Sequence, residues 1–177
     1  MTQIRNLALA AVPALGLAAF AAAPANAQFQ EGDYEIRLDG FAQTDVNLDG
    51  VDLNIGGTLG YFFSDQLEAG VRQTLSYTDI GADATNGSTA VFGNYHFGDR
   101  GGNLQPFIGL SLGYNYGESV SDTFFAGPEG GVKYFIEDNW FLFGQLEYQF
   151  FFEDSSDADE AIDDGTFLVR LGLGVVL

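Results

Sequence analysis

The chain has 177 residues, which suits a single domain, and it contains no cysteine, so a disulfide framework and a thiolate metal site are both excluded. Its six basic and 25 acidic residues give a formal net charge of −19, which argues against a nucleic-acid partner because nucleic acid requires a basic surface. Beyond the amino terminus no run of about 18 apolar residues occurs, so no membrane-spanning helix is predicted there.

The amino-terminal 27 residues have the pattern of a cleavable signal peptide. One cation, Arg5, precedes an apolar stretch over Leu7–Phe20, and an A-x-A cleavage signature follows with Ala25 and Ala27 at its two ends. A membrane anchor is the alternative, but the apolar stretch is short for that role. We therefore expect residues 1–27 to be removed on export and residues 28–177 to form the folded domain.

Eight candidate strands follow, separated by Gly, Asn, Asp and Ser, and no helical periodicity competes with them. They lie at about 33–43, 51–63, 67–77, 89–97, 104–116, 124–136, 140–152 and 166–177. Three connections are short, whereas those near 44–50, 78–88, 117–123 and 153–165 are mostly longer. An even number of strands with short turns at one end and longer loops at the other is typical of transmembrane barrels.

Alternate side chains within these segments separate into an apolar face and a charged face. The charged face holds Glu35, Arg37, Asp39, Asp52, Glu68, Arg72, Glu129, Lys133, Glu147 and Arg170, and the apolar face carries no charge. An ionic interior with an apolar exterior requires hydrocarbon as the solvent, and a bilayer forbids open sheet edges. The predicted fold is therefore all-β, an eight-stranded antiparallel transmembrane β-barrel.

Two details refine this prediction. Aromatic residues such as Tyr61 and Trp140 lie beside the short turns, and others such as Tyr77 and Tyr114 lie toward the longer loops, as expected for rings at both membrane interfaces. Pro128 interrupts the sixth segment, and because proline removes a ladder hydrogen bond we expect a bulge between residues 125 and 131.

Two stretches, "LQPFIGLSLGYNYG" (104–117) and "GPEGGVKYFIEDNWFLFGQLEYQF" (127–150), resemble the outer-membrane β-barrel domain family of small OmpA/OmpX-like proteins. The resemblance implies a Gram-negative outer membrane, with termini and short turns in the periplasm and longer loops outside. It also implies outer-membrane lipid as the surroundings, with periplasmic chaperones and the barrel-assembly machinery as partners during biogenesis.

The closing "RLGLGVVL" resembles the insertion signal that the barrel-assembly machinery reads, with Arg170, Gly172, Val175 and Leu177 at its positions. Leu177 stands where an aromatic residue is usual.

Three features of the sequence suggest chemical sites. His96 is the one histidine, so a His-based metal site is excluded, and a structural role inside the barrel is favoured over catalysis. Asp45, Asn47 and Asp49 match the opening of a calcium loop, but Gly56 occupies the position of the bidentate Glu, so a hairpin turn is favoured over metal binding. The acidic run 153–164 is interpreted as a solvated loop that binds divalent cations weakly at most.

The inward charges have two interpretations: they line an ion path, or they neutralise one another and plug the barrel. Plugging is favoured because unpaired charges in a narrow interior are costly. The sequence therefore predicts a monomeric structural or surface-interaction barrel with no cofactor and no enzymatic activity. A small porin-like channel is the alternative, and a lipid-active barrel enzyme is a further one.

Overall fold

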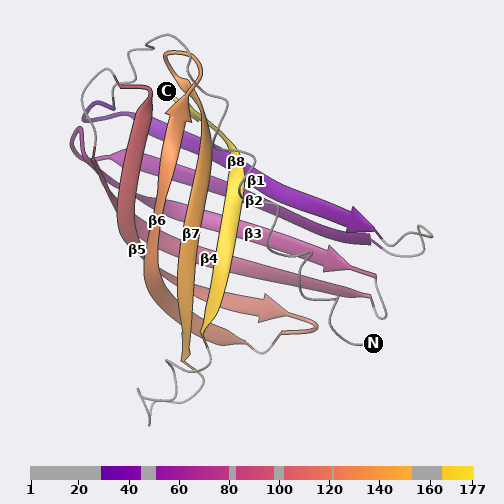
Figure 1. The fold of residues 1–177 in the computed structure, drawn as a ribbon. Coiled ribbons are helices and arrows are strands. Elements are labelled where there is room, and N and C mark those ends of the chain that lie inside the picture. The colour runs from indigo at the N-terminus through magenta and orange to yellow at the C-terminus, as the bar shows by residue number, and fades with distance from the viewer. Residues whose placement is uncertain (1–28, 45–50, 80–82, 98–101, 121, 153–164) are drawn as a thin grey trace, which may run out of the picture.

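The computed structural model describes residues 29–44, 51–79, 83–97, 102–120, 122–152 and 165–177. Its eight strands are β1 (Tyr34–Thr44), β2 (Val51–Phe62), β3 (Leu67–Thr78), β4 (Ala84–His96), β5 (Leu104–Gly117), β6 (Thr123–Phe135), β7 (Trp140–Phe152) and β8 (Thr166–Val176). Each pairs antiparallel with its neighbours in sequence, and β8 pairs with β1 to close the barrel (Figure 1). This confirms the predicted fold. No helix among these residues is long and apolar enough to cross a membrane.

The predicted strand bounds agree with the structure to within one residue, except at the start of β4. That strand begins at Ala84, five residues before the predicted start. Its first residues pair with β3 from Thr78↔Ala84 onward, although they include Asn86 and Gly87, which have the composition of a turn. The prediction was wrong here because the ladder of a neighbouring strand, not local composition, determines where β4 begins.

The predicted bulge around Pro128 is also wrong. β6 pairs with β5 without interruption, including Leu110↔Pro128. On its other side the ladder with β7 stops at Ala126↔Phe150 and resumes at Glu129↔Glu147, and the register is the same on both sides of the gap. The missing proline N–H therefore interrupts the ladder without inserting an extra residue. A Cβ at Gly127 would lie 1.6 Å from the carbonyl oxygen of Tyr148, so the strands approach closely where the ladder is broken.

The two faces of the barrel wall are separated as the alternation predicts. On β1, Leu38 points outward and is 61% exposed, whereas its neighbour Arg37 points inward and is 1% exposed. Large apolar side chains remain exposed on all eight strands, and the buried polar groups lie on the opposite face. A sheet with this arrangement requires apolar surroundings.

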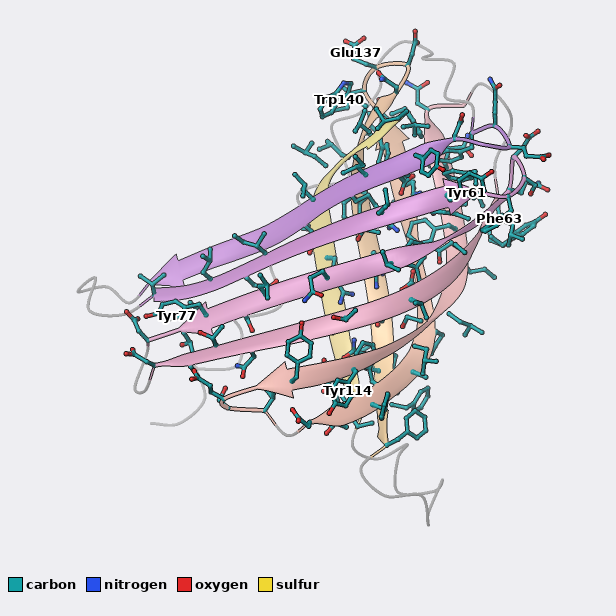
Figure 2. All side chains as sticks on the ribbon, turned by 180° about the vertical axis from the view of Figure 1, so that it is seen from behind. Tyr61, Phe63, Tyr77, Tyr114, Glu137 and Trp140 are labelled. Carbon is teal, nitrogen blue, oxygen red and sulfur yellow. The ribbon has the colours of Figure 1, made fainter. Side chains whose placement is uncertain are left out.

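Aromatic side chains mark the two ends of the barrel (Figure 2). Tyr61, Phe63 and Trp140 lie at the end of the barrel with the short turns, and Tyr77 and Tyr114 lie toward the end with the longer loops. Tyrosine and tryptophan favour the level of the lipid headgroups. The two sets therefore indicate the depth of the hydrocarbon layer along each strand.

Candidate functional site in the barrel interior

The interior of the barrel consists of three layers. Phenylalanine rings fill the end with the short turns, a network of buried charges lies next, and a cavity occupies the half toward the longer loops. An eight-stranded barrel is just wide enough for side chains to fill it.

The first half of the charge network surrounds Lys133, which is fully buried. Its Nζ donates to Glu35 Oε2 at 2.5 Å and to Glu68 Oε2 at 3.1 Å. Arg37 lies beside the same two carboxylates, with Nε 2.9 Å from Glu35 Oε1 and Nη2 3.6 Å from Glu68 Oε1. Two carboxylates and two cations thus neutralise one another in a region without solvent access.

The second half joins β3, β6, β7 and β8. Arg72 binds Glu129 through two contacts, Nη1 to Oε2 at 3.1 Å and Nη2 to Oε1 at 3.2 Å. Its Nη1 also donates to Glu147 Oε2 at 3.2 Å, and Arg170 Nη1 donates to the same carboxylate oxygen. Ser111 Oγ donates to the other oxygen of Glu147 at 2.8 Å. The paired geometry of Arg72 and Glu129 is the stronger form of a charged hydrogen bond.

Gln145 connects the two halves. Its Oε1 accepts from Arg37 Nη1 at 3.2 Å and from Arg72 Nη2 at 3.5 Å, and its Nε2 donates to Glu129 Oε2 at 3.0 Å. The side chain is 2% exposed. Because a neutral amide both accepts and donates, it joins the two guanidinium groups without adding charge.

The aromatic layer closes the end with the short turns. Phe29, which precedes β1, stacks on Phe62 with ring centroids 4.2 Å apart, and Phe135, Phe141 and Phe143 complete the buried cluster. Four rings surround the ammonium of Lys133, with centroids 4.9–5.5 Å from Nζ. The layer therefore packs directly against the charge network through cation–π contacts.

A turn holds Phe29 in place. Gly32 has a positive φ of 99°, and its N–H donates to the carbonyl of Phe62 at 2.9 Å. Asp33 accepts from the N–H of Gln30 through its carboxylate at 2.8 Å. Glycine is the residue that adopts this backbone conformation without strain. The chain before β1 thereby turns back into the barrel.

The half toward the longer loops contains a cavity of about 420 Å³. Amide and hydroxyl side chains from several strands line it, among them Asn54, Ser76, Asn115 and Gln149. Asp39 and Arg170 also line it. We call this cavity the vestibule.

The predicted interior charges occupy different parts of this interior. The structure brings Glu35, Arg37, Glu68, Arg72, Glu129, Lys133, Glu147 and Arg170 into the network. Asp39 lies instead at the vestibule, where its carboxylate covers Gly56. His96 is 2% exposed, with Nε2 2.9 Å from Glu68 Oε2 and its ring against Phe29, Phe62 and Phe107. Among the described residues, the imidazole ring is therefore enclosed by aromatic side chains and one carboxylate.

Other predicted features fall elsewhere. Asp45, Asn47 and Asp49, the acidic run 153–164, and the cleavage positions Ala25 and Ala27 lie outside the described residues. The predicted insertion signal covers the end of β8 and the residue after it. The positions of Arg170 and Gly172 face inward, Val175 lies on the opposite face, and Leu177, which follows the strand, exchanges backbone hydrogen bonds with Tyr34.

The sequence reasoning missed the aromatic layer. Phe62, Phe135, Phe141 and Phe143 alternate in step with inward polar residues such as Lys133, so the period-two pattern contained the signal for them. The same pattern places Gln145 on the inward face of β7. Phe29 had no such signal, because it precedes the first strand and is positioned by the turn at Gly32.

The chain is similar to known proteins over most of its length. The family model of the OprF membrane domain matches residues 9–177. Outer membrane porin F of Pseudomonas aeruginosa is 28% identical over 172 residues, a match that covers 86% of this chain and 47% of that protein. The chain thus spans about half the length of this curated relative.

Solved structures show the same fold. The N-terminal β-barrel domain of Pseudomonas aeruginosa OprF has a TM-score of 0.60 at 20% sequence identity, and the match covers 84% of this chain and 98% of that domain. The outer membrane protein OprG of Pseudomonas aeruginosa has a TM-score of 0.57 at 13% identity, covering 84% and 97%. The architecture is therefore that of a small barrel of the Gram-negative outer membrane. Since the family model matches nearly the whole sequence, the chain belongs to the OprF membrane domain family.

Proposed function

We propose that this protein is a structural, surface-interacting barrel of the outer membrane whose lumen does not conduct ions. The observation that carries the proposal is the charge network, in which side chains from β1, β3, β6, β7 and β8 meet across the lumen. The aromatic layer lies directly beneath it. An ion crossing the barrel would have to displace both layers.

The charges of the network favour a plug over an ion path. Glu35, Glu68, Glu129 and Glu147 face Arg37, Arg72, Lys133 and Arg170, so the formal charges balance. Removing one partner of a buried ion pair leaves an uncompensated charge at a cost of about 3–5 kcal/mol. The closed arrangement is therefore favoured over one in which an ion passes between separated partners.

A planar-bilayer recording tests the plug. The wild-type protein is expected to be nearly silent, whereas the double variant Glu129→Ala with Lys133→Ala is expected to pass current. It removes bulk from the lumen, keeps the charge balanced and takes away the ammonium around which the rings of the aromatic layer pack. Glu137→Ala is the control, because Glu137 is exposed in a short turn. Steady, ion-selective current from the unmodified protein that these substitutions leave unchanged would overturn the proposal.

A small porin-like channel is the alternative. Two observations favour it: the relative named outer membrane porin F, and the vestibule, which leaves the loop-side half of the lumen unfilled by the described side chains. In the same recording this alternative requires current from wild-type protein, and solute uptake by vesicles that contain it. A lipid-active enzyme is a weaker candidate, because it would require a lipid product that disappears in His96→Ala, whose side chain is enclosed by rings.

The orientation of the barrel is part of the proposal. We infer that the short turns and both ends of the mature domain face the periplasm and that the longer loops face outward. An epitope tag inserted at Asp157 should be labelled on intact cells, and one at Asp138 should not. Reversed labelling would refute this orientation.

The expected partners follow from the membrane location. We propose that the mature domain, residues 28–177, reaches the membrane as a monomer with the help of periplasmic chaperones and the barrel-assembly machinery. Crosslinking from the end of β8 to the machinery during assembly would test this. The absence of any crosslink from this position to the machinery during assembly would contradict it.

A further inference from the structure

The seam between β1 and β8 is paired along only part of its length. Five ladder pairs, from Glu35↔Val176 to Asp39↔Gly172, join the two strands. β1 nevertheless remains paired with β2 up to Thr44↔Val51, and β8 with β7 up to Gln149↔Thr166. In the strand segments that the structure describes, residues 40–44 and 166–171 therefore have a ladder on one side only. Both figures show β1 and β8 diverging from the end where they are paired (Figures 1 and 2).

Part of each unpaired edge lies at the depth of the hydrocarbon layer. On β8, Phe167 is opposite Tyr148 at the loop-side aromatic level, and Val169, 70% exposed, lies closer to the barrel middle. On β1, Gly40 is opposite Ile55, which in turn is opposite Leu75, two residues before the aromatic position Tyr77. A bilayer does not tolerate unpaired backbone groups facing lipid, but it does tolerate them where they line a water-filled cavity.

The vestibule is a cavity that can take this role, because it reaches the seam. Its lining includes Leu168 and Arg170 from the inward face of β8 and also Val169 and Leu171 from the outward face. Gly40, on the opposite edge, lines it too. Because both faces of one strand border the same space, the cavity passes around the free edge of β8 and opens on the lipid side.

The chemistry of this space differs between its wall and its opening. In the wall, beside the last ladder pair of the seam, Asp39 Oδ2 is buried and accepts no hydrogen bond, and amide groups such as that of Asn54 line the same space. Arg170 has its guanidinium committed to Glu147. At the opening the side chains are aliphatic. A hollow that holds a carboxylate oxygen without a hydrogen-bond partner and has an apolar side exit fits a molecule with a cationic head and a hydrocarbon chain, and 420 Å³ lies in the usual range of ligand pockets.

We propose that the β1–β8 seam is a lateral opening through which the vestibule binds an amphiphile with a primary ammonium head. The head lies at Asp39, and the hydrocarbon chain leaves between β1 and β8 into the loop-side leaflet. The site is separate from the plug, which closes the barrel below it. A current through the unmodified barrel would overturn the plug and leave this binding site intact.

The absence of cysteine from the chain permits a direct test of the opening. Continuing the register of Asp39↔Gly172 places position 43 opposite position 168. Tyr34 and Leu177 exchange both backbone hydrogen bonds, so the alternation makes 43 and 168 a pair without hydrogen bonds, with Cα atoms about 4.5 Å apart when the seam closes, within the range of a disulfide. Oxidation of Gln43→Cys with Leu168→Cys should therefore lock the seam shut.

Binding is measured by fluorescence quenching in phosphatidylcholine vesicles. In a Trp140→Phe background, Asn115→Trp places the one tryptophan in the vestibule wall. The probe is a hexadecylammonium with a nitroxide on its chain. Quenching is expected in the reduced cysteine variant and should be lost on oxidation. The control disulfide, Val71→Cys with Val91→Cys, joins lipid-facing positions of β3 and β4 that are already paired and do not line the vestibule, and it should leave quenching unchanged.

Two further arms test the head group. Asp39→Asn should bind the ammonium probe roughly tenfold more weakly, the loss expected when a charge-assisted hydrogen bond is removed. A hexadecyl sulfate with the same nitroxide should quench less than the ammonium. Chain-labelled phosphatidylethanolamine distinguishes a membrane phospholipid from a free amphiphile as the source of the ammonium.

The proposal is overturned if oxidised and reduced forms are quenched equally while the disulfide is intact. It is also overturned if the ammonium and sulfate probes bind alike and Asp39→Asn changes neither. If the folded variant forms no disulfide, the head-group arms alone decide.

Discussion

Replacing Lys133 with Met tests the charge network most directly. The ammonium is fully buried and binds Glu35 and Glu68 at 2.5 and 3.1 Å. Methionine keeps most of the side-chain length among the surrounding rings but leaves the network with one uncompensated negative charge. Removing one partner of a buried pair costs about 3–5 kcal/mol, and because Arg37 still lies beside both carboxylates, the lower part of that range is expected.

A second substitution makes the test specific. Glu35→Gln alone leaves an excess positive charge and should also destabilise, but Glu35→Gln with Lys133→Met restores the balance. The double variant should therefore cost less than the sum of the two single costs by about 1–3 kcal/mol. Glu137→Gln, the same change at an exposed turn, should stay within about 0.5 kcal/mol of wild type.

The free energy of unfolding is measured by urea titration of protein folded into lipid vesicles, followed by the fluorescence of Trp140, the one tryptophan. Strictly additive costs, or a Lys133→Met cost below about 1 kcal/mol, would refute the reasoning, because either result means that the lysine and its carboxylates are not coupled in a dry interior.

Three further outcomes are expected. Leu110→Arg, on the lipid face of β5, should lower the free energy of unfolding by about 2–4 kcal/mol, whereas Leu104→Arg, at the interface end of the same strand, should cost about 1 kcal/mol or less; equal costs would mean that the membrane depth is misassigned. Phe29→Ala should cost about 3–5 kcal/mol in the same titration, and Phe29→Leu clearly less, because the ring closes the aromatic layer. Leu177→Phe should speed assembly by the barrel-assembly machinery, measured as the rate at which the folded form appears on gels, and an unchanged rate would argue against the insertion signal.

The strands and their faces could be predicted because two different solvents impose a strict alternation. On β3, Glu68 and Arg72 share the inward face and Val71 lies outward at 49% exposure. Register errors of one residue would invert every such assignment, so a strand with several charges fixes its own orientation. The same alternation assigns the buried phenylalanines to the inward face when it is applied to aromatic residues in the way that it was applied to charged ones.

What could not be predicted depends on contacts between distant segments. The first residues of β4 are strand because they pair with β3, although their own composition favours a turn. Phe29 enters the barrel because the N–H of Gly32 donates a hydrogen bond to the carbonyl of Phe62. The partly open seam has no local signal at all. Phe167, Val169 and Leu171 alternate as they would in a fully paired strand, so the divergence from β1 is a property of the whole barrel.

The balanced network divides the charge of the molecule into two populations. Four acidic and four basic residues neutralise one another inside, so the net charge of −19 belongs to the other 21 of the 25 acidic and two of the six basic residues, with seven acidic residues in 153–164 alone. Salt screens exposed charges over about 8 Å at physiological ionic strength and buried pairs much less. Added salt should therefore reduce the repulsion between neighbouring barrels in a membrane and leave the folding of each barrel almost unchanged. Ionic strength then sets how closely these molecules approach one another, independently of how firmly each is folded.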